Sequence, residues 1–324
     1  MSRCSLVSTL LQSRRLQNPS NFDKLYKTFL LSSRHSSIVL SPPDCVVHGV
    51  SLVENTVIVS SRSKLFMYQI NNLNNHSHSH SHSHNHNINE MEISSVPSIL
   101  QLTSEIDISW QHHDVFVCNS RDQSYLFFLS THTQIPVRPS RCCYRLSPSV
   151  VIVGGDEGVY VYQNDLLTQT ISTPSSVLTI TSSSTNSSIF FVGCRDGSVY
   201  RWVVGSHDLQ WWCRCRHAIV SIAAIDECVC IVDAGGAVKL NKNLVGIRGA
   251  QCVSSDGEEH FIVALKNEIL CLDCTGAIFS SLPLRDIRFL RCTESFILAS
   301  DTSQVHIQSK PGHSIHCDFI QSNV

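Results

Sequence analysis

A run of alternating histidines is the first feature of this chain that could support chemistry. Neutral imidazole is a common ligand of zinc, nickel and copper, and the run supplies six rings: His76, His78, His80, His82, His84 and His86. Because Ser and Asn separate the histidines, the spacing fixes no coordination geometry and offers no residue that would orient a ring. We therefore predict a solvated low-complexity segment, and we expect no metal ion or other cofactor.

Cysteine pairs are the second such feature. Cys271 and Cys274 have the CxxC spacing of zinc and redox sites, but no second CxxC follows, and Cys271 falls in an apolar strand pattern. Two closer pairs lack histidine partners: Cys213 with Cys215, and Cys228 with Cys230. We interpret the thiols as small apolar residues of strands. The odd total of 15, without a disulfide framework, indicates a reducing compartment.

The triplet of His112, His113 and Asp114 could support acid–base chemistry. The chain, however, contains no G-x-S-x-G nucleophile motif, no P-loop and no GxGxxG fingerprint between a strand and a helix. We predict that the protein is not an enzyme and has no catalytic residue, and no small-molecule substrate is evident.

An aromatic and basic run, Trp-Trp-Cys-Arg-Cys-Arg-His at 211–217, is the strongest candidate for partner binding. Trp and Arg are enriched at the energetic centres of protein interfaces, and alternating aromatic and cationic groups can also stack on RNA bases and neutralise phosphates. A third interpretation packs one or both tryptophans inside the fold and leaves the arginines in solvent. The candidate partner-binding residues are Trp211, Trp212, Arg214 and Arg216.

A repeated two-strand unit must position these groups. In each copy a short apolar run, a small or polar turn and a second alternating run follow one another. The seven copies are 56–59 with 65–68, 115–117 with 125–128, 151–153 with 159–162, 189–192 with 199–202, 229–232 with 237–240, 261–264 with 268–271, and 296–299 with 305–307. From the second copy onward the turns recur at steps of 32 to 40 residues, which is typical of stacked supersecondary units. The pattern predicts an all-β chain with a single seven-bladed β-propeller at 38–320.

The first two copies lie further apart because the polar histidine tract separates them, and we predict a disordered low-complexity loop at 71–92. Alternating segments at 176–180 and 218–223 precede the fourth and fifth copies, where the innermost strands of two blades should line the central channel. A ring of blades must close its seam. We expect one chain end to pair into the blade that the other end begins.

The N-terminal residues 1–37 are basic and Ser-rich, with Asp23 as the one acid. This composition is typical of a mitochondrial transit peptide, and the alternative is a disordered N-terminal arm on a cytoplasmic or nuclear protein. The whole chain has a formal charge of −2 and a pI of about 6.8, which does not favour nucleic acid as a partner. No apolar run approaches the roughly 18 residues of a membrane span.

Two segments give the chain a resemblance to WD40 repeats. Residues 190–202 read FFVGCRDGSVYRW and residues 153–162 read VGGDEGVYVY, with a tight turn followed by a strand that ends in an aromatic residue. The Trp-Asp dipeptide is absent, and Gly312-His313 is the one Gly-His pair. Segments 222–224, 260–265 and 294–299 resemble strands of RCC1-type propellers, without that family's Gly-rich stretches. We take a divergent WD40-like propeller as the first assignment and an RCC1-like one as the second.

This resemblance implies a non-catalytic scaffold that mediates protein–protein interactions in a multi-subunit complex. The first alternative is an RCC1-like regulator of a GTPase or another enzyme, and the second is an RNA-associated accessory subunit. The expected partners are other proteins.

Overall fold

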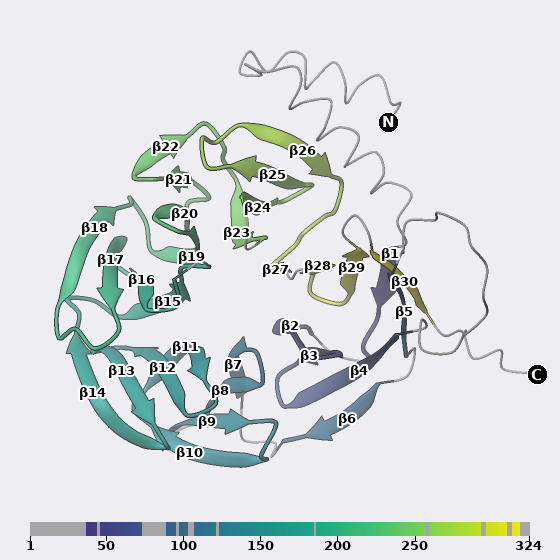
Figure 1. Ribbon diagram of the computed structural model, residues 1–324, viewed down its shortest axis with the longest axis horizontal. Helices are drawn as coiled ribbons and strands as arrows, with labels where there is room; N and C mark the ends of the chain where they lie inside the picture. The colour runs from purple at the N-terminus through teal and green to yellow at the C-terminus, as the bar shows by residue number, and fades with distance from the viewer. Residues whose placement is uncertain are drawn as a thin grey trace, which may run out of the picture.

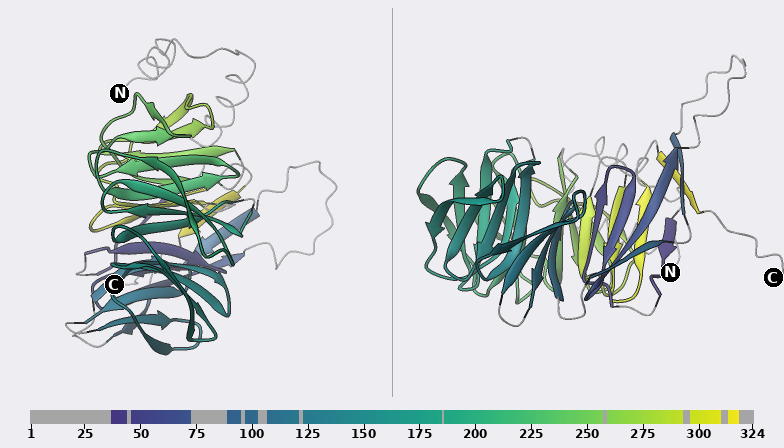
Figure 2. Two further views of the ribbon diagram at one scale, coloured as in Figure 1. Left: turned by 90° about the vertical axis from the view of Figure 1, so that its left-hand side faces the viewer. Right: turned by 90° about the horizontal axis from the view of Figure 1, so that it is seen from below.

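The computed structural model describes residues 37–43, 46–72, 89–94, 97–102, 107–120, 123–184, 186–256, 259–292, 296–309 and 313–317. Within these ranges the chain is all-β and forms seven radial sheets around a central channel (Figure 1). Figure 2 shows the ring edge-on, with the strands running across its thickness. The predicted seven-bladed β-propeller is therefore confirmed. No helix long and apolar enough to cross a membrane occurs in the described residues.

Each blade has four strands, which follow one another from the channel to the rim. The first blade contains β2 (Gly49–Val53), β3 (Thr56–Ser60), β4 (Lys64–Asn72) and β6 (Ser98–Gln101); the second, β7 (Asp107–His112), β8 (Val115–Asn119), β9 (Ser124–Phe128) and β10 (Thr133–Val137); the third, β11 (Ser140–Ser147), β12 (Val150–Gly155), β13 (Gly158–Gln163) and β14 (Leu166–Ser172); the fourth, β15 (Val177–Ser182), β16 (Ile189–Cys194), β17 (Ser198–Val203) and β18 (Leu209–Arg214). The fifth contains β19 (Ile219–Ile225), β20 (Cys228–Asp233), β21 (Val238–Leu240) and β22 (Asn243–Val245); the sixth, β23 (Ala250–Ser255), β24 (His260–Leu265), β25 (Ile269–Asp273) and β26 (Ile278–Leu282); the seventh, β27 (Phe289–Cys292), β28 (Phe296–Ser300), β29 (Val305–Ser309) and β1 (Ser37–Leu40).

Each of the seven two-strand copies forms the two middle strands of one blade, as the spacing predicts. These strands are apolar on both faces because each sheet packs between two neighbours. Seven apolar clusters fill the seven interfaces between adjacent blades. Glycines allow the closest approaches: a Cβ at Gly193 would lie 2.5 Å from Cγ2 of Ile219 in the next blade, and one at Gly154 would lie 2.5 Å from Cγ1 of Val177.

The two ends of the chain cross the seam of the ring in opposite directions. Strand β1 pairs antiparallel with β29 and completes the seventh blade, which confirms the expected closure. At the other end β30 (His313–Cys317) pairs in parallel with β5 (Asn89–Ile93), which itself continues the first blade beside β4. The sequence predicts one crossing, and the structure has two.

Both ends of the segment predicted as a loop at 71–92 form strands. Asn71 and Asn72 belong to β4 and pair with β5, whose residue Ile93 is fully buried. In this register Ile93 lies opposite Ile70, in the apolar cluster at the seam. The histidine tract and the N-terminal arm lie outside the described residues, at 73–88 and 1–36.

Candidate functional site

Strand β18 forms the rim of the fourth blade and carries most of the predicted partner-binding run. It pairs with β17 on one side, and no other described strand pairs with it. Trp211 lies opposite Tyr200 in this register, and its side chain is 65% exposed. Arg214 also lies in solvent, with Nη2 3.7 Å from Oδ2 of Asp196. Arg216 follows β18 and is exposed.

Trp212 faces the opposite side of the blade from Trp211. A register shift between β17 and β18 makes Trp212 the extra residue of a bulge. Its ring packs edge-on against Phe191, with centroids 5.3 Å apart, in the interface between the fourth and fifth blades. Lys242, from the fifth blade, places Nζ 4.2 Å from the Trp212 ring centroid in a cation–π contact. Trp212 therefore stabilises the blade interface, as one interpretation of the run predicts.

The rim is more basic than its own sequence indicates. The Lys239 ammonium donates a hydrogen bond to the Arg214 backbone carbonyl, so the fifth blade brings Lys239 and Lys242 beside β18. Asp196 is the carboxylate paired with Arg214 in this region. Arg214 and Lys239 are joined only by the packing of two blades, and no local sequence signal predicts that contact. We call Trp211, Arg214, Arg216, Lys239 and Lys242 the blade-4 rim patch.

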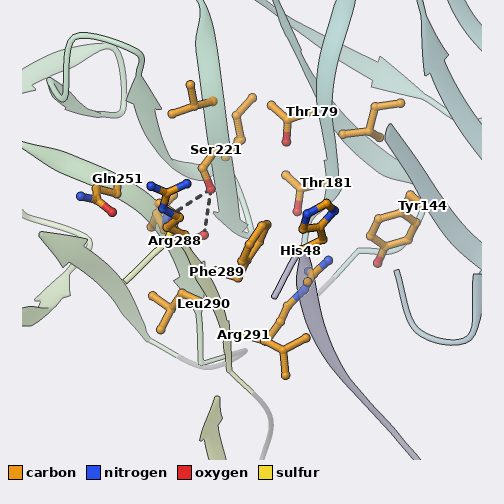
Figure 3. A pocket seen from close by; sticks show the side chains of 17 residues that line it. His48, Tyr144, Thr179, Thr181, Ser221, Gln251, Arg288, Phe289, Leu290 and Arg291 are labelled. Carbon is orange, nitrogen blue, oxygen red and sulfur yellow. Dashed lines mark hydrogen bonds between the residues drawn. The ribbon is translucent and has the colours of Figure 1, made fainter. Parts of the chain in front are cut away.

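A second candidate site is a cavity of about 250 Å³ in the central channel (Figure 3). Its walls come from innermost strands, among them β2, β11, β15, β19, β23 and β27. Two arginines line it, Arg288 just before β27 and Arg291 within β27. The other polar side chains are those of His48, Tyr144, Thr179, Thr181, Ser221 and Gln251. The described residues that line the cavity include no Asp or Glu.

Arg291 places a guanidinium in the wall of this channel. Burial lowers its pKa, but a guanidinium remains protonated at neutral pH. Burial, and then the Arg291 charge, lower the pKa of His112 well below its usual value. Burial also raises the pKa of Cys252, another lining residue, to about 12, so its thiol carries no negative charge.

In the structure, the three residues of the predicted acid–base triplet lie in different surroundings and do not form one site. The His112 ring is buried against Tyr144, with centroids 4.0 Å apart, and its Nδ1 accepts the Arg145 backbone N–H at 3.1 Å. Asp114 pairs with the Arg145 guanidinium, which joins the second and third blades. Burial is the largest single effect and would raise the pKa of Asp114, but the hydrogen bonds from Arg145 and Ser130 and the Arg145 charge together outweigh it and lower the pKa. His113 is exposed, and its backbone carbonyl accepts a hydrogen bond from Ser51.

The described cysteines are free thiols, most of them buried in strands. Burial raises the pKa of Cys118 and of Cys194 to about 12, which suits apolar packing rather than thiolate chemistry. Cys271 and Cys274 are half-buried. In the part of the chain that the structure describes, no three His, Cys, Asp or Glu side chains gather in a way that could hold a metal ion.

Comparison with known proteins adds no family to this picture. No protein-family model matches the chain, and no curated protein matches it either. The resemblance to WD40 repeats is therefore supported by the propeller fold alone.

Proposed function

We propose that this propeller is a non-catalytic scaffold of a multi-protein complex, and that it binds an acidic segment of a partner protein at the blade-4 rim patch. One observation carries the proposal, which is the exposure of Trp211 on an edge strand. Tryptophan is usually highly buried, as Trp202 of the same sheet is. A solvent-exposed indole on an edge strand that also carries an exposed arginine, Arg214, has the composition of an interface centre.

The partner's chemistry follows from charge and backbone geometry. Four cations lie on or beside β18: Arg214, Arg216, Lys239 and Lys242. An acidic segment that binds there would gain favourable electrostatics and associate faster. The outer backbone edge of β18 can accept an extended chain by strand addition. Such binding should weaken as salt rises, because exposed charges more than about 10 Å apart are screened at 0.1 M ionic strength.

Quantitative affinity purification from cells tests this function. The tagged proteins are wild type, Trp211→Ala, Arg214→Glu and a control, Ile99→Ala, which removes another exposed rim side chain from the first blade. Truncating an interface hot spot costs about 2 kcal/mol or more, so recovery of the partner should fall roughly 30-fold with Trp211→Ala and remain unchanged with Ile99→Ala. Equal recovery with all four proteins contradicts the proposal.

The same experiment separates the alternatives. Recovery that disappears after RNase treatment favours an RNA-associated subunit. A co-purifying GTPase or other enzyme whose rate changes when the propeller binds favours an RCC1-like regulator.

A further inference from the structure

We propose that Cys228 and Cys274 form a reversible disulfide that links the fifth and sixth blades when the folded protein meets glutathione disulfide. Cys228 is the first residue of β20, and Cys274 directly follows β25. The two blades lie side by side in the ring (Figure 1). In a reducing compartment such a bond is transient and forms under oxidation. The modification does not depend on the scaffold function proposed for the rim.

The two cysteines are in contact across the interface between these blades. The Cys228 thiol donates a hydrogen bond to the Cys274 backbone carbonyl, with Sγ 3.8 Å from the oxygen. Both side chains pack against the same apolar cluster, and the two thiols are hydrogen-bond partners. The turn after β25 lies against the fifth blade, because a Cβ at Gly276 would be 3.5 Å from Leu240 and from Val245. The sulfur atoms are therefore neighbours, as disulfide formation requires.

The cysteines that lie nearest in sequence are less well placed. Cys271, which shares the CxxC spacing with Cys274, packs on the other side of the sixth blade, in the cluster toward the seventh. Cys230 is fully buried in β20. Residues two apart in a strand have Cα atoms about 6.8 Å apart, at the upper limit for a disulfide. Cys228 and Cys274 are therefore the favoured pair.

The pair is accessible from one face of the ring. Both thiols are half-buried. Cys228 follows the turn between β19 and β20, and the Cys274 thiol donates to the Glu259 carbonyl in the turn before β24, with Sγ 3.8 Å from the oxygen. The turn residues around the two thiols are exposed: Glu227, Asn241, Glu259 and Thr275. A small oxidant can therefore reach the thiols while the protein stays folded.

Thiol–disulfide exchange forms the bond in two steps. Cys274 loses its proton to water, attacks one sulfur of glutathione disulfide and releases the first glutathione. Cys228 then loses its proton and attacks the Cys274 sulfur, which breaks the mixed disulfide and releases the second glutathione. Each released thiolate takes up one proton. The two protein thiols are oxidised, and the glutathione disulfide is reduced.

The order of these steps follows from the surroundings of Cys228. Burial, and then the hydrogen bond with Cys274, raise the pKa of Cys228 to about 12, so its thiolate is scarce at neutral pH. Cys274 is therefore the thiol that meets the oxidant first. The second attack occurs within one molecule, where proximity favours it.

Peptide mapping of the folded, full-length protein tests the site. The protein is treated with glutathione disulfide, its free thiols are alkylated, and it is digested with trypsin. Cys228 falls in peptide 217–239 and Cys274 in peptide 267–285. We expect these peptides to be joined after oxidation and separated by dithiothreitol. The absence of the joined product overturns the proposal, and so does glutathione that stays on Cys274 without it.

Variants assign the bond to the two residues. Cys228→Ala and Cys274→Ala should each abolish the joined product, whereas the control Cys271→Ala, which removes a half-buried cysteine of the same peptide, should retain it. The disulfide would close a loop between residues 46 positions apart. Oxidation should therefore raise the Tm of wild type by roughly 5 °C and leave that of Cys274→Ala unchanged. A joined product that persists in Cys274→Ala overturns the pairing.

Discussion

Replacing Trp202 with Ala should destabilise the ring more than any change at the rim. The Trp202 side chain is 0% exposed in the cluster between the third and fourth blades, and its ring centroid lies 5.6 Å from that of Phe190. Its Nε1 donates to the Ser206 carbonyl at 3.0 Å. Removing a buried Trp side chain costs about 3–5 kcal/mol because the cavity closes only in part. At about 2–4 °C per kcal/mol, the Tm should fall by roughly 6–20 °C.

Chemical denaturation of four purified proteins measures this effect: wild type, Trp202→Ala, Trp202→Phe and Trp211→Ala. The Phe variant keeps an aromatic ring against Phe190 and should lose clearly less stability than the Ala variant. Trp211→Ala should stay within about 0.5 kcal/mol of wild type, because its side chain is mostly in solvent. A cost below about 1 kcal/mol for Trp202→Ala, far under the range for a buried Trp, would refute this packing role, and so would an equal cost for Trp211→Ala.

Three further predictions concern the seam, the blade contacts and pH. Leu40→Ala should cost about 2–5 kcal/mol in denaturant unfolding, because Leu40 is 3% exposed in the seam cluster, whereas Val39→Ala, at 48% exposure in the same strand, should cost under about 0.5 kcal/mol. Gly193→Val should lower the Tm by several degrees, because a Cβ at this position would lie 2.5 Å from Ile219 Cγ2. Gly205→Val meets no atom within 4 Å of the added Cβ, so it should lose only the smaller amount that comes from forcing a Val into a positive φ. His260 Nδ1 lies 2.8 Å from Asp256 Oδ2, and this hydrogen bond raises the pKa of His260. The protonated His260 therefore stabilises the folded state below about pH 6.5, and this stabilisation is lost as pH rises through the folded-state pKa of His260. Unfolding free energies at pH 5.5 and 8.5 should therefore differ more in wild type than in Asp256→Asn.

The ring of blades could be predicted from the sequence because each blade is a local unit. The two middle strands of a blade are joined by a short turn, so one continuous stretch such as 189–202 contains the whole hairpin and its apolar pattern. The seam was only half predictable. Strand β1 pairs where a closing strand is expected, but the parallel pairing of β30 with β5 joins residues more than 200 positions apart and leaves no periodic signal.

The candidate sites were less predictable for the same reason. The exposed position of Trp211 follows from its place in an edge strand, whereas the bulge that turns Trp212 into the blade interface has no mark in the sequence. The channel cavity combines residues from His48 to Arg291, drawn from blades all around the ring. Only the folded ring brings these side chains together.

Hydrogen exchange of the propeller, alone and in complex with the partner recovered by the wild-type protein, tests the interaction scaffold most directly. The amides of β18 (Leu209–Arg214) pair on one side with β17 among the described strands, so the outward-facing ones should exchange rapidly in the free protein. We predict that the partner slows exchange in β18 and leaves that of β6 in the first blade unchanged. Unchanged exchange in β18, with protection elsewhere on the ring, would contradict binding at the blade-4 rim patch.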